Sequence, residues 1–385
     1  MANNVYRYYW YFGIGYLSID ITATFGISTL RGSHMIMSNN ANNFRLDGFP
    51  IHPIWRYSAF RNANFSEHLS TPELDRPQYN IDEAVYDRMK PGLRLATLFL
   101  ELVTPELAHI FNAGVEPQPY HEEKPSQRLS AWRGTPAKYR ALNAELVRLS
   151  KMYRVTAFRP KPQGGDKDEP KCYFIKTDTA VTDLIWCPSH TRPYKQFYPQ
   201  SAICTTWQAF FERQDWDTIG DDEKNARLLL LAVTLIHELA HVVWFHRVSR
   251  YYELSAKKGR KDFSDIEFDP SEPVFGERQW AECGYVIEES LVSGYLSYSN
   301  IVQMPNYPNP PRNCVLYAMR EWPAVGQTQI QVNEVPPHRI EDFFIHETWQ
   351  RGPDAALAGY HQVAIDNLTD RHMARSFVLE ADPML

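Results

Sequence analysis

The chain has 385 residues, of which 44% are hydrophobic and 22% are charged, a balance typical of a globular protein with a sizeable core. Its net charge of −6 gives no reason to expect nucleic acid or an anionic membrane as a partner. The five cysteines are odd in number and none forms a C-x-x-C pair, which argues against a secreted disulfide framework. We therefore expect a cytoplasmic protein in which any metal site is built from histidine and carboxylate side chains.

The N-terminal stretch differs in character from the rest of the chain. Residues 6–30 are aromatic and apolar, but Asp20 interrupts them and no basic segment precedes them. They therefore predict neither a signal peptide nor a membrane span. The run Arg-Gly-Ser-His-Met at 31–35 resembles the remnant of an expression vector. We expect residues 1–36 to be a leader or an expression scar outside the native fold.

The remaining residues predict an α+β fold that is predominantly helical. Residues 159–171 are rich in proline, glycine and charged residues, which is typical of a boundary between domains. We expect a mainly helical part at 37–165 and a catalytic part at 166–385. The alternative is one continuous domain at 37–385. Helices are expected at 81–112 (with breaks at Pro91 and Pro105), 136–152, 200–214, 221–250, 277–297, 340–351 and 354–368, strands at 172–176 and 180–186, and an exposed loop at 251–271.

The motif H-E-L-A-H at 237–241 lies within a long apolar run from Leu228 to Phe245. Histidines four residues apart are about 40° apart around a helix, so both imidazoles can reach one metal ion. Glu238 lies at the flank of the same face, where it can act on a water molecule without being a ligand. The alternative interpretation is that His237 and His241 are ordinary core histidines and that Glu238 is an exposed charge.

A catalytic zinc ion usually has three protein ligands and one open position, so a third ligand is required. One large class takes a histidine six residues after the second motif histidine, with a glycine between. Trp244 and Arg247 occupy those two positions, so that class is excluded. His246 lies about 140° around the helix from the second motif histidine and cannot join the same ion.

Glutamates on the helix expected at 277–297 are the remaining candidates for the third ligand. Glu282 is the first choice, because it lies among apolar neighbours, where a carboxylate is costly unless it is paired or bound to a metal. Gly284 beside it would allow two helices to approach closely. Glu288 is the second choice, with the alternative that it is a solvated surface charge.

These motifs resemble those of an uncharacterised group of fungal zincin-like proteins. Members of that group run H-E-x-A-H, E-P-x-F and E-L-G-x-x-x-E, followed by a Gly-Gly pair, and the chain matches them at 237–241, 272–275 and 282–288. It departs from them at Cys283 and with Ser-Gly at 293–294, changes that alter packing more than metal ligation. The Phe-Phe and Trp of residues 342–349 are similar to a C-terminal element of the group. The resemblance covers about residues 228–351 and implies a zincin-like, gluzincin-like metallopeptidase fold.

The combined expectation is a zinc metallopeptidase. Zn²⁺ is held by His237, His241 and Glu282, and a zinc-bound water hydrolyses the peptide bond with Glu238 as the general base. Three side chains remain open as the stabiliser of the oxyanion: Tyr285, His338 and His346.

The expected partner is a peptide or protein substrate, with no nucleic acid and no membrane. The strand at 180–186 is the candidate edge strand on which an extended substrate can pair, although an ordinary sheet strand without a substrate role fits it as well. Two alternatives are a catalytically inactive zincin-like binding protein and a metal-dependent hydrolase of a non-peptide amide. The presence of Glu238 argues against the first, because a merely structural metal site needs no general base.

Overall fold

The computed structural model describes residues 46–60, 78–79, 81–112, 128–129, 135–158, 180–187, 196–204, 210–257, 272–275, 282–292, 295–299, 315–319, 329–335, 337–350 and 376–380. All of these ranges belong to one compact unit, residues 41–385. The leader expected at 1–36, the strand expected at 172–176 and the helix expected at 354–368 lie outside the described residues.

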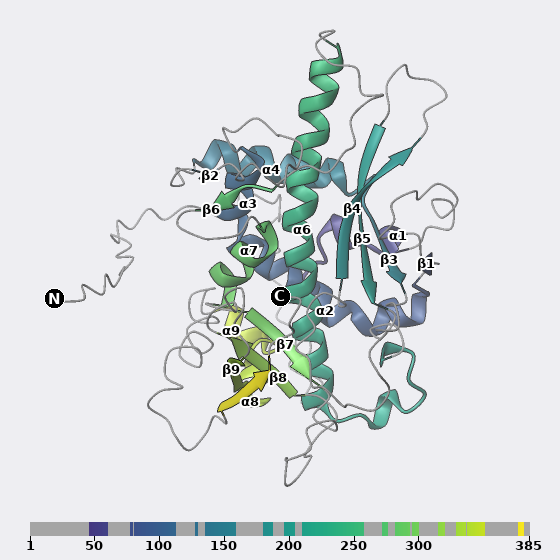
Figure 1. The fold of residues 1–385 in the computed structure, drawn as a ribbon. Helices are drawn as coiled ribbons and strands as arrows, with labels where there is room; N and C mark the ends of the chain where they lie inside the picture. The colour runs from purple at the N-terminus through teal and green to yellow at the C-terminus, as the bar shows by residue number, and fades with distance from the viewer. Residues whose placement is uncertain are drawn as a thin grey trace, which may run out of the picture. The chain divides into compact units, whose positions relative to one another are not determined.

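Helices predominate over strands in the described part of the chain, as expected (Figure 1). The α-helices are α1 (Tyr57–Phe60), α2 (Glu83–Leu102), α3 (Thr104–Phe111), α4 (Pro136–Leu149), α6 (Asp221–Lys257), α7 (Cys283–Val292), α8 (Pro337–Asp342) and α9 (His346–Gln350). The strands are β1 (Gln78–Tyr79), β2 (Arg128–Leu129), β3 (Arg154–Phe158), β4 (Ala180–Cys187), β5 (Gln196–Cys204), β6 (Val274–Phe275), β7 (Tyr295–Ser299), β8 (Val315–Met319), β9 (Gln329–Glu334) and β10 (Ser376–Glu380).

The 37-residue helix α6 is the centre of the described core. It begins with three acidic side chains in its first turn, where the partial positive charge of a helix start favours them, and this confirms the predicted start at Asp221. Helices α2, α3, α7 and α8 and strands β4 and β5 all pack against it (Figure 1). By length and composition the segment from Asp221 to Tyr251 could cross a bilayer, but 83% of its most apolar window is buried inside the protein, as in a core helix.

Helices α2 and α6 approach each other closely at Gly92. A Cβ atom at that position would lie 3.0 Å from the backbone oxygen of Leu228, so the contact depends on the missing side chain. The break predicted at the preceding residue, Pro91, is wrong, because the buried face of α2 packs against α6 and outweighs the loss of one backbone hydrogen bond. The break predicted at Pro105 is confirmed, since this proline lies in the first turn of α3.

One sheet of the unit packs directly against α6. Its strand order is β1-β3-β5-β4, with β3 parallel to β5 and β4 antiparallel to it. The strand predicted at 180–186 is therefore confirmed as β4, and it is the outer strand next to β5 among the described residues. Because β3 precedes residue 165 and β5 follows it, this sheet joins the two expected parts of the chain. The second sheet, in the order β10-β9-β8-β7, is antiparallel throughout.

Four predicted elements are partly wrong. The helix predicted at 340–351 is instead two short helices, α8 and α9, with residues 343–345 between them. The other three errors have a physical reason. Residues 200–204 were expected in a helix but form the end of β5, because β3 and β4 pair with them from both sides and override local propensity. The helix predicted at 277–297 ends at Val292, and residues 295–297 pair with β8 instead. Residues 251–257, expected in a loop, extend α6. They include Glu, Leu, Ala and Lys, which have high intrinsic helix propensity even where no apolar periodicity is present.

A buried charge cluster fastens α4 to α6. Glu145 of α4 is 9% exposed, and one of its oxygens accepts hydrogen bonds from His246 of α6 and from Arg148. Its other oxygen lies 3.5 Å from Nη1 of Arg250. Burial raises the pKa of Glu145, but the hydrogen bonds from His246 and Arg148 outweigh it and lower the pKa to about 2.

We predict that Glu145→Gln lowers the free energy of unfolding by about 1–3 kcal/mol at pH 7, because it leaves the buried ring of His246 without its charged acceptor. The folded-state pKa of Glu145 lies below its unfolded value, so its contribution is present at neutral pH and is lost as the pH falls from about 4.5 toward 2. Urea denaturation at pH 7 and pH 3 should show a smaller difference from wild type at pH 3. The exposed Glu83 provides a matched Glu→Gln control.

Candidate metal centre

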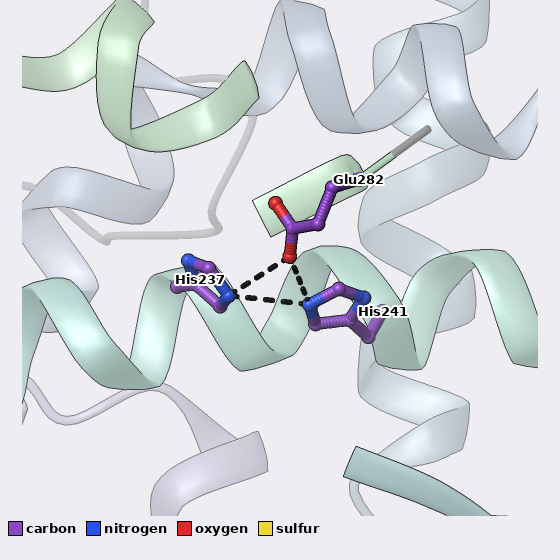
Figure 2. A group of neighbouring side chains, drawn as sticks. All are labelled: His237, His241 and Glu282. Carbon is purple, nitrogen blue, oxygen red and sulfur yellow. Dashed lines mark hydrogen bonds and ion pairs between the residues drawn. The ribbon is translucent and has the colours of Figure 1, made fainter. Parts of the chain in front are cut away.

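Two histidines of α6 and the glutamate that precedes α7 meet at one point (Figure 2). The Nε2 atoms of His237 and His241 lie 3.2 Å apart. Oε1 of Glu282 lies 3.1 Å from the first nitrogen and 2.7 Å from the second. The three donor atoms therefore form a small triangle with sides of similar length.

The size of this triangle fits a small transition-metal ion. Zinc binds nitrogen and oxygen at about 2.0–2.2 Å, so two ligands of a tetrahedral zinc ion lie roughly 3.3 Å apart. Calcium instead takes about six to eight oxygen ligands, which two imidazole nitrogens do not supply. The side chain of Glu282 is 23% exposed, so the triangle is not sealed from solvent. The donor set and its dimensions are thus those of a group that could hold a small transition-metal ion, and they are not specific to zinc.

Glu282 is held in position by the helix that follows it. Because α7 begins at Cys283, Glu282 occupies the N-cap position. Its Oε2 accepts a hydrogen bond from the backbone N–H of Tyr285, the third residue of the helix, as an N-cap side chain does. One carboxylate oxygen is thus fixed by the start of α7, while the other faces the two histidines.

Each histidine also contacts a second carboxylate through its other ring nitrogen. Nδ1–H of His237 donates to Oε1 of Glu288 over 2.7 Å, and Nδ1–H of His241 donates to Oε1 of Glu272 over 2.5 Å. Such bonds fix the tautomer in which Nε2 offers its lone pair to a metal. Glu288, the second choice for the third ligand, is only 1% exposed and lies behind His237, away from the triangle.

The carboxylates dominate the electrostatics of the cluster. Burial alone lowers the pKa of His237, but Glu282 and Glu288 outweigh it and raise the pKa to about 9. Burial likewise lowers the pKa of His241, and Glu272 with Glu282 holds it well above its usual value. Burial raises the pKa of Glu282, yet the two histidines hold it well below the usual range. The cluster therefore requires positive charge, which a divalent cation would supply in place of the two protons.

The approach of α7 to α6 depends on Gly284. A Cβ atom built on this glycine would lie closer than 3.0 Å to three ring atoms of His237. That ring cannot easily move aside, because its Nδ1 is bonded to Glu288 and the ring of Tyr285 packs against it at 5.1 Å between centroids. The expectation that Gly284 allows a close helix approach is confirmed.

Glu238 is buried on α6 at 4% exposure. Near it lies Tyr153, a fully buried residue whose hydroxyl donates to Oγ of Ser201 on β5 over 2.7 Å. Burial raises the pKa of Tyr153, and the negative charge of Glu238 raises it further. The candidate general base therefore lies within electrostatic range of Tyr153, which is hydrogen-bonded to the sheet that packs against α6. The alternative of an exposed Glu238 is wrong.

No protein-family model, no curated protein and no solved structure matches the chain.

The remaining candidate residues lie in different surroundings. His246 contacts Glu145, which agrees with its exclusion from the ligand set. Among the three candidates for oxyanion stabilisation, Tyr285 packs against His237, whereas the ring of His346 packs against Phe49 at 4.7 Å. His338 is exposed on α8.

Glu272 is the site residue to which sequence reasoning assigned no role. It was noted only as the first residue of the E-P-x-F motif at 272–275. Its position two residues before the short strand β6 gives no signal of a metal centre. The available signal was chemical: a motif histidine of this kind commonly donates its second N–H to a carboxylate, so a partner was to be expected somewhere in the chain.

We predict that Gly284→Ala weakens zinc binding at least tenfold, because the new methyl group must displace the imidazole of His237. Overpacking of this kind also lowers stability by about 1–3 kcal/mol. Zinc affinity can be measured by competition with a chromophoric chelator. Gly220→Ala is the matched control, since nothing lies within 4 Å of its added Cβ. Unchanged zinc affinity in Gly284→Ala would contradict the close approach of the two helices.

We further predict that Glu282→Ala abolishes stoichiometric zinc binding, while Glu288→Ala weakens it by about 10–100-fold. The first change removes a donor atom of the triangle, and the second removes a hydrogen-bond acceptor behind His237. Metal content after dialysis against buffered zinc measures both. Loss of the ion in Glu288→Ala with retention in Glu282→Ala would reverse the two assignments.

Proposed function

We propose that the chain is a zinc-dependent metallopeptidase with a zincin-like fold, in which His237, His241 and Glu282 hold the ion. The observation that carries the proposal is that two Nε2 atoms and one carboxylate oxygen lie 2.7–3.2 Å apart. Both histidines are on α6, the helix that also carries the buried Glu238. The contacts of both histidines with further carboxylates strengthen it, because ligating histidines in metalloenzymes are typically held in this way.

The arrangement of α6 and the neighbouring sheet supports the zincin-like assignment. In zinc peptidases an edge strand commonly lies beside the active-site helix, where an extended substrate can pair with its backbone. Strand β4 packs against α6 and is the outer neighbour of β5. We assign β4 as the strand along which a peptide substrate binds.

When bound, zinc supplies Lewis-acid chemistry, since it lowers the pKa of a water ligand from 15.7 toward about 7 and polarises a carbonyl group. Glu238 accepts a proton from the attacking water as the water oxygen bonds to the carbonyl carbon. Glu238 then gives this proton to the amine nitrogen as the carbon–nitrogen bond breaks. Tyr285, whose ring packs against His237, is the favoured donor of a hydrogen bond to the developing oxyanion.

Two other functions use the same site differently. A zincin-like binding protein would hold the metal for structure alone, and a hydrolase of a non-peptide amide would apply the same chemistry to a smaller substrate. Burial of Glu238 favours catalysis over a structural site, because an ionisable group inside a protein is costly without a role. A peptide library assayed beside a set of small amides separates the two catalytic possibilities.

We predict that Glu238→Gln retains one equivalent of zinc but loses at least 10²-fold in kcat, because the amide cannot accept a proton. The measurement combines metal analysis with cleavage of a peptide library followed by mass spectrometry.

Glu83→Gln, on the exposed surface of α2, provides the control for loss of a carboxylate. Wild-type cleavage should be abolished by a chelator and restored by zinc. Full activity in Glu238→Gln would contradict the mechanism. Stoichiometric zinc with no chelator-sensitive cleavage of any peptide would support the binding protein instead.

A further inference from the structure

Glu272 contacts two of the segments that build the metal centre. Its Oε1 accepts from Nδ1–H of His241 on α6, while its Oε2 accepts over 2.6 Å from the backbone N–H of Cys283, the first residue of α7. Cys283 is joined directly to Glu282, the third corner of the triangle. One carboxylate therefore bridges the histidine ligand of one helix and the attachment point of the glutamate ligand on the next.

We propose that Glu272 is a positioning residue that sets the separation between His241 and Glu282 and thereby the geometry of the metal centre. This inference rests on the proposed metal site, but it does not depend on peptide hydrolysis. The two oxygens of a carboxylate lie at a fixed distance from each other, so the bridge transmits the placement of α7 directly to the imidazole of His241.

The backbone of Glu272 is itself well anchored, as a positioning residue requires. Pro273 follows it and restricts its backbone to extended conformations. The next two residues form β6, which pairs with β2 in parallel, and Phe275 is buried at 9% exposure. The ring of His109 on α3 packs against Phe275 at 5.9 Å between centroids. The side chain of Glu272 is only 12% exposed, so little space remains for it to move.

Glu288 provides the internal comparison. It accepts from Nδ1–H of His237, but its other oxygen lies 3.5 Å from the backbone N–H of Leu296, beyond the C-terminal end of α7. It therefore holds one ligand, and its second oxygen is directed to β7 and not to the N-terminal turn of α7. The two carboxylates perform the same task for their histidines, and Glu272 in addition accepts a hydrogen bond from the attachment point of the third ligand.

The experiment compares Glu272→Gln with Glu288→Gln. A glutamine offers one acceptor oxygen, so at position 272 it must release either the His241 N–H or the Cys283 N–H. We expect the zinc dissociation constant to rise by about 100-fold in Glu272→Gln and by about 10-fold in Glu288→Gln. The visible absorption of bound Co²⁺, which reports coordination geometry, should change in Glu272→Gln. Both measurements need the metal alone and no substrate.

Glu272→Asp tests the same idea conservatively. It keeps both acceptor oxygens but withdraws them by about one carbon–carbon bond, ~1.5 Å, so its zinc affinity should lie between those of wild type and Glu272→Gln. Glu83→Gln should match wild type in affinity and in the Co²⁺ spectrum. Thermal unfolding in a chelator shows that each variant is folded before metal is added.

Three results would overturn the proposal. The first is zinc affinity within threefold of wild type, or an unchanged Co²⁺ spectrum, in folded Glu272→Gln. The second is a loss in Glu272→Gln no larger than that in Glu288→Gln, which would assign Glu272 to His241 alone. The third is failure of both position-272 variants to fold, which would make the residue a requirement for folding. Wild-type protein that binds zinc without cleaving peptides would refute the proposed peptidase and leave this inference intact.

Discussion

Buried charge is the constraint on which the centre of this protein depends. Three carboxylates, from Glu272, Glu282 and Glu288, surround the imidazoles of two histidines at the junction of α6, α7 and the segment before β6. A carboxylate in such surroundings is tolerated only when it is paired or bound to a metal. Every pairing contact therefore restricts the relative positions of the segments, and the same contacts leave the two Nε2 atoms and one oxygen facing one another. The contacts that neutralise the buried carboxylates are therefore the same contacts that arrange the donor atoms of the cation site.

The histidine ligands and the candidate general base of the proposed chemistry project from the same stretch of the long helix α6. Its histidines contact the start of α7, where a glycine lets the helices approach and where the second oxygen of the N-cap glutamate faces both rings. Glu238, one residue along and about 100° around the helix, lies within electrostatic range of Tyr153, near the sheet that includes β4 and β5. In the proposed function, a substrate paired along β4 would approach Glu238 from the side of the sheet.

Much of the site could be predicted because helical periodicity is local. The spacing of His237 and His241 places both rings on one face whatever surrounds the helix, and the apolar neighbours of Glu282 indicated a paired carboxylate. The local sequence ranked Glu282 before Glu288 but could not decide between them, since one precedes a short helix and the other lies within it. The N-cap position of Glu282 turns its oxygen toward the histidines, whereas Glu288 lies six residues later, behind His237. Glu272 was out of reach for a stronger reason, because its partners are 31 and 11 residues away and in different elements.

The sequence by itself determined the features that depend on residues close together in the chain. These are the start of α6 at its acidic turn, the placement of His237 and His241 on one face of that helix, the exclusion of the three-histidine class, and the strand β4. Only the tertiary structure decided the elements and contacts that depend on distant partners. Residues 200–204 are strand because β3 and β4 pair with them, and α2 continues through Pro91 because its buried face packs on α6. The physical reason is the same in each case. Backbone hydrogen bonds across a sheet, close helix packing and the neutralisation of buried charge join residues that are far apart in the chain, and no local pattern specifies which of several candidates will be joined.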